Sequence, residues 1–225
     1  IRDRDVTGVQ TCALPILKYY HTQEYIMKVR ITCDPSHEFG KRFTELFDID
    51  FYSRRNGFDI HNRQNLEKFL SETSNYDLTI NFSRAMEFGQ TILLNNLDQY
   101  CNKTKTNHKV LNIGSYEGTV LMNHPTSGYD VEKATLKIAH RKIATEHMLF
   151  EGFLDSYLIN LNYLENNGSI IKYHPHIKML DFDSVLKNVK YMMDRPYIKE
   201  MYVQYKQPGN FRINDGYGII IPGVF

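Results

Sequence analysis

The sequence contains no long apolar run. The longest candidate, Gly218 to Phe225, is short and is broken by Pro222. A helix that crosses a bilayer needs roughly 18 to 20 predominantly apolar residues in succession. We therefore expect a protein without a membrane-spanning segment and without membrane partners.

Cysteine is scarce, and its spacing is not that of a disulfide or zinc framework. The three cysteines, Cys12, Cys33 and Cys101, lie far apart and form no C-x-x-C pair. This usage favours a reducing compartment, and we expect a cytoplasmic protein. The segment His174-Pro175-His176 has no cysteine or acidic partner at a diagnostic spacing, so we interpret it as a surface loop and expect no metal site.

Neither sign of charge is in excess. Lys and Arg total 27 and Asp and Glu total 26, which gives a net charge of +1 at pH 7. A protein that binds nucleic acid by neutralising phosphates normally carries a larger basic excess, so we expect no nucleic-acid partner. Hydrophobic residues make up 42% and charged residues 24%. This composition is typical of a globular chain and excludes wholesale disorder.

The first residues do not have the pattern of a folded segment. Residues 1–16 read IRDRDVTGVQTCALPI, which has neither helical nor alternating periodicity. This stretch resembles translated sequencing-adapter read-through, and the alternative is a genuine, poorly ordered arm. We expect residues 1–26 to be an extension, artefactual or disordered in part, and Met27 to be the native start. Residues 27–225 are then a single domain.

From Lys28 onward, short β-branched or aromatic runs alternate with longer helical stretches. The expected strands are 28–33, 49–53, 77–82, 109–113, 156–161 and 200–205, and the expected helices are 39–47, 62–72, 89–101, 127–150 and 182–193. Strands that alternate with helices of this length predict βαβ units around a parallel sheet. The expected fold is α/β: a Rossmann-like, doubly wound parallel sheet of about six strands with helices on both faces, in three α/β/α layers.

The chemically informative residues are Ser115, Tyr129 and Lys133. Ser115 comes at the carboxyl end of the strand that contains Asn112-Ile113-Gly114. Tyr129 and Lys133 are four positions apart at the start of a helix, so they project from the same face. A neighbouring ammonium stabilises a phenolate and lowers the pKa of a tyrosine, which otherwise titrates near pH 10. The serine hydroxyl can donate to a substrate oxygen, so this group suits proton transfer to a carbonyl.

The pattern Y-x-x-x-K is weak by itself, and the sequence contains it twice. The second copy, Tyr202 and Lys206, spans the end of the last expected strand. Strand residues four apart are separated by about 13 Å and do not form a compact pair. We interpret that second pair as structural, because only Tyr129 and Lys133 follow a strand-terminal serine on a helix.

With these motifs, residues 27–206 resemble the short-chain dehydrogenase/reductase superfamily. The resemblance implies that Tyr129 is the acid/base, that Ser115 orients the substrate carbonyl, and that Lys133 lowers the tyrosine pKa and binds the nicotinamide ribose. It also implies reversible hydride transfer between a nicotinamide cofactor and a small-molecule carbonyl or alcohol substrate. The family's fourth group, an asparagine in the helix before the serine strand, is not clearly matched; Asn95 and Asn96 lie in that helix and neither is assigned.

The expected phosphate-binding turn departs from the family pattern T-G-x-x-x-G-x-G. The chain reads T-C-D-P-S-H-E-F-G from Thr32 to Gly40, with Cys33 at the first glycine. A side chain there narrows the space for the phosphates. The positions that the resemblance assigns to cofactor binding in this turn are Thr32, Ser36, Phe39 and Gly40.

Other expected cofactor positions follow the next two strands. The turn Ser53-Arg54-Arg55 has no acidic residue, which favours NADP over NAD because an arginine can pair with a 2′-phosphate. The pair Asp59-Ile60 resembles the Asp-hydrophobic pair beside the adenine, and Asn81-Phe82-Ser83-Arg84 aligns with N-N-A-G. The expected cofactor-binding residues here are Ser53, Arg54, Asp59, Ile60, Asn81 and Ser83, together with Tyr129 and Lys133.

Two interpretations remain open at the level of sequence. The first is an active NADP-dependent oxidoreductase, and the second is a degenerate relative that binds a nucleotide weakly or not at all and acts through partner contacts. A sugar-nucleotide epimerase or dehydratase is disfavoured, because few residues follow the last expected strand. The resemblance also makes the helix 127–150 a candidate contact in a homo-oligomer, and the segment 167–176 a candidate lid over the substrate.

Overall fold

The computed structural model describes residues 27–82, 87–115, 128–161, 164, 180–203 and 219–220. The strands in the described residues are β1 Lys28–Ile31, β2 Asp48–Phe51, β3 Leu78–Asn81, β4 His108–Ser115, β5 Leu154–Leu161, β6 Glu200–Val203 and β7 Ile219–Ile220. The helices are α1 Glu38–Arg42, α2 Arg63–Ser71, α3 Gly89–Thr104, α5 Gly128–Phe150 and α7 Phe182–Met193, with short 3₁₀ helices η1 Phe43–Glu45, η2 Arg54–Asn56 and η3 Thr73–Asn75.

The strands form one sheet in the order β2-β1-β3-β4-β5-β6-β7. All neighbouring strands from β2 to β6 pair in parallel, and β7 pairs with β6 in the antiparallel direction. After β1 the chain adds β2 on one side of it and then returns to add β3 on the other side. The expected α/β parallel sheet is confirmed. In such sheets a ligand binds outside the carboxyl ends of the strands at the point of reversal, here β1 and β3.

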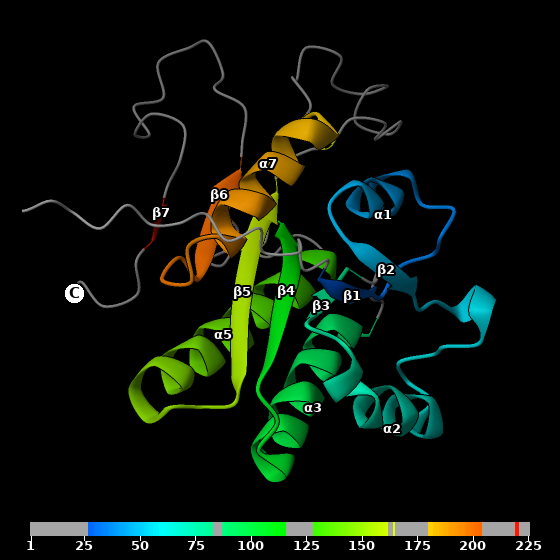
Figure 1. Cartoon of the computed structure of the whole chain (residues 1–225), viewed down its shortest axis with the longest axis vertical. Helices are drawn as coiled ribbons and strands as arrows, with labels where there is room; N and C mark the ends of the chain where they lie inside the picture. Colours follow the sequence, from blue (N-terminus) through cyan, green and yellow to red (C-terminus); the bar gives the residue numbers. More distant parts are fainter. Residues whose placement is uncertain are drawn as a thin grey trace, which may run out of the picture.

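The helices cover both faces of the sheet and complete three layers. Helices α2, α3 and α5 lie on one face, and α1 and α7 lie on the other (Figure 1). Each helix buries an apolar stripe against the strands, as Leu93, Leu94 and Leu97 do in α3, where all three are fully buried.

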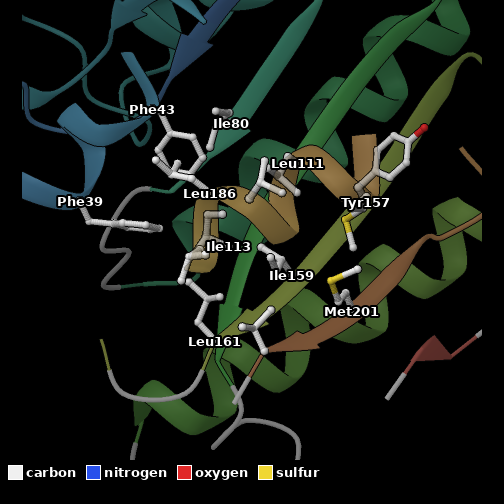
Figure 2. Packing of buried hydrophobic residues seen from close by; sticks show 14 of the residues in the cluster. Phe39, Phe43, Ile80, Leu111, Ile113, Tyr157, Ile159, Leu161, Leu186 and Met201 are labelled. Atoms are coloured by element: carbon white, nitrogen blue, oxygen red, sulfur yellow. The ribbon is translucent and has the colours of Figure 1, made fainter. Parts of the chain in front are cut away.

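The face under α1 and α7 is apolar. Leu111 and Ile113 of β4 alternate with residues that face the other layer, and Figure 2 shows them beside Leu186 of α7. Phe39 of α1 belongs to the same cluster and stacks on Phe182 with ring centroids 5.3 Å apart. Burial of each such side chain stabilises the fold by about 1.5–3 kcal/mol.

The face under α2, α3 and α5 carries a layer of buried polar side chains at alternate strand positions, which we call the polar layer. Its members, each 2% exposed or less, are Arg30, Thr79, Asn81, Asn112, Ser156, Asn160 and Glu200. Buried polar groups of this kind stabilise a fold only when they are hydrogen-bonded. The Arg30 guanidinium meets this requirement: it donates to the Thr79 hydroxyl at 2.8 Å, to the Phe69 carbonyl at 2.5 Å and to the Thr73 hydroxyl at 2.9 Å.

Two histidines complete the polar layer. His108 Nε2 lies 2.8 Å from the Thr79 hydroxyl, and His140 Nδ1 of α5 lies 2.9 Å from the Ser156 hydroxyl. Burial, the largest effect on both, lowers the pKa of His108 to about 3 and that of His140 to about 4. Both rings are therefore neutral in the folded protein at neutral pH.

The structure differs from the sequence expectation at two elements. The expected helix 39–47 is the five-residue α1 followed by η1, since Leu46 N donates to the Phe43 carbonyl at 3.0 Å in the tighter 3₁₀ pattern. The strand expected as the last one, 200–205, is β6, and β7 follows it. Without β7 the backbone groups of β6 would lie at an open sheet edge, which pairs readily with another strand.

The two buried histidines predict that acid destabilises the protein. In the unfolded chain a histidine protonates below about pH 6.5. The folded state resists this protonation, so the free energy of unfolding should fall between pH 6.5 and about 4, by up to about 1.4 kcal/mol per pH unit for each histidine. Urea unfolding at a series of pH values measures this slope. The substitution His140→Gln should reduce it and the exposed-site control His61→Gln should not; equal slopes in all three proteins would contradict the assignment.

Candidate functional site

The carboxyl ends of β1, β3 and β4 bring the predicted site segments to one edge of the sheet. The Thr32 amide, just after β1, donates to the Ile80 carbonyl of β3 at 3.0 Å, and the Phe82 amide donates to the Thr32 hydroxyl at 3.0 Å. Ser115 is the last residue of β4 and is half-buried. The edge beside these three strands is therefore where a ligand of this fold is expected.

Lys133 of α5 reaches the same edge. Its Nζ donates to the Ile113 carbonyl of β4 at 3.0 Å and to Gln90 Oε1 of α3 at 2.5 Å. Since Ile113 comes two positions before Ser115 in the same strand, these contacts bring the lysine to the end of β4 that carries the serine. A motif on α5 and a motif on β4, far apart in sequence, thus meet in space.

Tyr129 precedes Lys133 by one helical turn. The Lys133 Nζ lies 5.4 Å from the centroid of the Tyr129 ring, within the range of cation–π attraction. The tyrosine side chain is 46% exposed, so a ligand can approach it from solvent. The segment 116–127, between the serine and this helix, lies outside the described residues.

Burial lowers the pKa of Lys133 to about 8, and the field of Glu132 opposes this shift. The amine is still mostly protonated at neutral pH, but its charge is poorly solvated. A poorly solvated cation interacts strongly with any anionic group beside it.

In the turn after β1, the Cys33 side chain packs into the fold. The Cys33 side chain is buried, and a Cβ added to Gly40 would lie 2.6 Å from its sulfur. Cys33 thus fills the room that Gly40 leaves inside the fold. The exposed part of the turn carries Asp34, whose Oδ1 accepts from the Ser36 amide at 2.8 Å and from the Ser36 hydroxyl at 2.5 Å.

The two arginines after β2 point to different partners. The Arg54 guanidinium pairs with the Asp59 carboxylate at 3.3 Å. The Arg55 guanidinium reaches the turn after β1, where Nε lies 3.0 Å from Asp34 Oδ2 and Nη1 donates to the Ser36 hydroxyl at 2.9 Å. Arg55 therefore lies beside the expected phosphate turn, whereas Arg54, the arginine that the sequence analysis expects to bind the cofactor, contacts Asp59. The only sequence signal for Arg55 is that two arginines follow one another after β2.

Several other predicted cofactor residues have buried or internally bonded side chains. Thr32, Phe39 and Gly40 are buried, and Asn81 Nδ2 donates to Asn112 Oδ1 at 2.9 Å and to the Gln90 carbonyl at 2.8 Å. A cofactor contact from these residues would have to come from the main chain.

The remaining predicted cofactor positions lie after β2 and β3. The Ser53 amide and hydroxyl both bond to Asn56 Oδ1, at 2.6 and 3.2 Å. Ile60 is half-buried against the core under α2 and α3. Ser83 and Arg84 lie outside the described residues, as do the candidate lid 167–176 and His174-Pro175-His176.

Gln90 is a site residue that sequence reasoning did not find. It is the second residue of α3, only 4% exposed, and its side chain bonds to Lys133 as well as to the ends of β3 and β4. A glutamine near the start of a helix belongs to no recognisable catalytic motif. The only sequence signal was that the family's fourth catalytic group is expected in the same helix.

Within the described residues, no group of three or more His, Cys, Asp or Glu side chains could hold a metal ion. In the same part of the chain, no helix combines the length and the apolar character that a membrane crossing requires.

No family model matches the sequence, and no curated protein matches it. Solved structures do resemble the fold. A short-chain dehydrogenase from Burkholderia cenocepacia in complex with NADP has a TM-score of 0.60 at 12% identity, over 80% of this chain and 88% of that chain. A short-chain dehydrogenase from Leptospira borgpetersenii with bound NAD+ has a TM-score of 0.59 at 15% identity, over 79% of this chain and 91% of that chain.

A third similar structure is a GDP-mannoheptose C4 reductase from Campylobacter jejuni with NADP bound. Its TM-score is 0.55 at 12% identity, over 79% of this chain and 78% of that chain. These structures share the parallel sheet and its flanking helices with this chain. The chain therefore has the fold of the short-chain dehydrogenases/reductases.

Proposed function

We propose that this chain is an NADP-dependent oxidoreductase of the short-chain dehydrogenase/reductase type, acting on a small-molecule carbonyl or alcohol. The observation that carries the proposal is the attachment of Lys133 to the Ile113 carbonyl, which brings the Tyr129–Lys133 turn of α5 to the end of β4 that carries Ser115. A phenol, an ammonium and a hydroxyl at the ligand-binding edge of this fold suit carbonyl reduction and alcohol oxidation.

In this proposal Tyr129 exchanges a proton with the substrate oxygen. Lys133 stabilises the phenolate through its ammonium, which the Ile113 carbonyl and Gln90 hold in place. Ser115 donates a hydrogen bond to the substrate oxygen and orients it. A bound nicotinamide supplies or accepts the hydride.

The cofactor's 2′-phosphate would lie beside Arg55, between the turns that follow β1 and β2. The residues present fit an anionic group there, since the Arg55 guanidinium is exposed and already pairs with the Asp34 carboxylate. An arginine that holds a carboxylate can hold a phosphate with the same donors. The preference for NADP over NAD is proposed on Arg55. Similar folds occur with NADP and with NAD+, so the fold itself leaves this choice open.

A degenerate relative that does not turn over substrate is the second candidate, and the turn after β1 favours it. The Asp34 carboxylate already occupies the Ser36 amide. Glu38 adds a negative charge at the start of α1, and this helix has only five residues. Negative side chains near the turn oppose a phosphate, and a short helix offers a weak dipole.

Cofactor titration separates the two candidates. In the enzyme, NADPH fluorescence should change in a saturable way when purified protein is added. With an aldehyde or ketone that the protein reduces, Tyr129→Phe should lower turnover by about 10²- to 10⁴-fold because the proton donor is lost, while NADPH still binds. The control Tyr197→Phe removes an exposed hydroxyl just before β6, and it should leave turnover unchanged. No saturable NADPH signal up to millimolar cofactor would overturn the proposal.

Arg55 and Arg54 form a matched pair for testing cofactor preference. Arg55→Ala should weaken NADPH binding by about tenfold, because a charge-assisted contact to the 2′-phosphate is lost, and should leave NADH binding nearly unchanged. Arg54→Ala removes the neighbouring guanidinium, whose partner is Asp59, and should affect both cofactors little. Fluorescence titration measures the dissociation constants of NADPH and NADH for both variants. If the two substitutions weaken NADPH binding equally, the proposed role of Arg55 is contradicted.

We also propose that residues 27–225 act as one domain in a cytoplasmic homo-oligomer. Helix α5 exposes apolar side chains, with Val131 39% and Ile138 57% exposed on the same side of the helix. Ile138→Glu should therefore lower the oligomeric mass in light scattering after gel filtration, because a charge would be buried at the contact. The control Arg63→Glu alters an exposed charge on α2, away from this side of α5. A monomeric wild-type protein would refute the oligomer.

A further inference from the structure

Gln90 lies where three elements meet. It is 4% exposed, and each polar atom of its side chain has a partner in a different element. Oε1 accepts from Lys133 Nζ of α5 at 2.5 Å, and Nε2 donates to the Asn81 carbonyl of β3 at 2.6 Å and to the Ile113 carbonyl of β4 at 3.1 Å. A buried amide with this set of partners is held in one orientation.

The orientation follows from the donors and acceptors. The two carbonyls of Asn81 and Ile113 can only accept, so they require the NH₂ side of the Gln90 amide. Rotation of the amide by 180° would place its oxygen against two carbonyl oxygens and its NH₂ group against the Lys133 ammonium. That arrangement is repulsive at every contact, so the protein presents an oxygen acceptor to Lys133.

The main chain of Gln90 is fixed as well. Its carbonyl accepts from Asn81 Nδ2 at 2.8 Å, and the same amide donates to Asn112 Oδ1 at 2.9 Å. Asn112 Nδ2 in turn donates to the Ser156 hydroxyl at 3.1 Å and to the Tyr157 carbonyl at 3.0 Å. The polar layer of the sheet thus anchors the residue that contacts the lysine.

We propose that Gln90 is the positioning residue of Lys133: its Oε1, together with the Ile113 carbonyl, fixes the ammonium at the end of β4, with its charge near Tyr129 and its third N–H donor left for the ligand. This inference deepens the proposed function and rests on it. Among the described residues, these two oxygens are the hydrogen-bond acceptors of the lysine. An ammonium has three N–H donors, so two are used for attachment.

Among the described residues, Glu132 of α5 is the charged group whose field acts on the Lys133 amine, and Tyr129 is its aromatic neighbour. On α3 the lysine meets the neutral amide of Gln90, and on β4 it meets a main-chain carbonyl. Gln90 therefore decides, more than any described side chain across from α5, how well the ammonium is stabilised.

Two nearly isosteric substitutions test the proposal in opposite directions. Gln90→Met removes the acceptor and should lower the pKa of Lys133, because a buried amine without a partner prefers its neutral form. Gln90→Glu places a carboxylate beside the ammonium and should raise the pKa of Lys133 by about one unit or more. General damage to the fold would not move the two values in opposite directions.

The control is Thr91→Val, at the next position of the same helix. Thr91 is buried, and its hydroxyl has no hydrogen-bond partner among the described residues, so an isosteric valine should change neither stability nor the site. The pKa of Lys133 is measured by lysine side-chain ¹H–¹⁵N NMR on the full chain without cofactor, with the signal assigned by its loss in Lys133→Met. Urea unfolding shows whether each variant is folded.

Kinetics supply the second readout. In Gln90→Met, kcat should fall by about 100-fold, the effect of a misplacement of about 1 Å, with a smaller change in KM. In alcohol oxidation, the acidic limb of the pH profile should move to higher pH, since a less cationic lysine stabilises the phenolate less. Thr91→Val should retain the wild-type profile.

The outcomes distinguish this proposal from the proposed function. Identical Lys133 titrations in wild type, Gln90→Met and Gln90→Glu would overturn the positioning role, whatever the cofactor does. Opposite shifts in a protein that binds no NADPH would overturn the oxidoreductase proposal while supporting the attachment of Lys133 by Gln90. Opposite shifts together with the lowered kcat support both.

Discussion

The ammonium of Lys133 is the charge around which α3, α5 and β4 are arranged. Taking a charged amine out of water costs several kcal/mol unless polar partners replace the water. Here the partners are the Ile113 carbonyl of β4 and the Gln90 amide oxygen of α3, so both elements stabilise the docking of α5 at the end of β4. The same contacts place the tyrosine of the preceding turn, Tyr129, near the carboxyl end of β4.

The two faces of the sheet carry different kinds of side chain, because successive side chains along each strand point to opposite faces. Under α1 and α7 the strands contribute apolar side chains and form the larger core (Figure 2). Under α2, α3 and α5 they contribute the polar layer, in which Asn81, Asn112 and Ser156 bond across neighbouring strands. This hydrogen-bonded layer tolerates substitutions less well than an apolar core does, because each lost partner leaves a buried polar atom unsatisfied. It is a rigid support for the site above it.

At the proposed cofactor end of the edge, one residue packs favourably and one charge is unfavourable for a phosphate. Cys33 replaces a residue without a side chain, yet its sulfur lies inside, against Gly40, and does not obstruct the outer surface of the turn. The negative charge of Asp34 is the larger obstacle to a phosphate, and the Arg55 guanidinium offsets it. Gly114 shows the same close packing in β4, where an added Cβ would meet the Asn160 amide of β5. Small residues at these two positions let neighbouring groups approach.

The fold class and the order of the strands and helices could be predicted from the sequence, because periodicities of two and 3.6 residues arise from neighbours along the chain. The pairing of Tyr129 with Lys133 could be predicted for the same reason, since one helical turn separates them. The contact of Gln90 with Lys133 could not be predicted, because the two residues lie 43 positions apart and meet only after α3 and α5 dock on β4. The contact of Arg55 with the turn after β1, the inward turn of Cys33 and the pairing of β7 with β6 likewise depend on groups distant in sequence. Local patterns determined the elements, and only their packing decided which side chains meet.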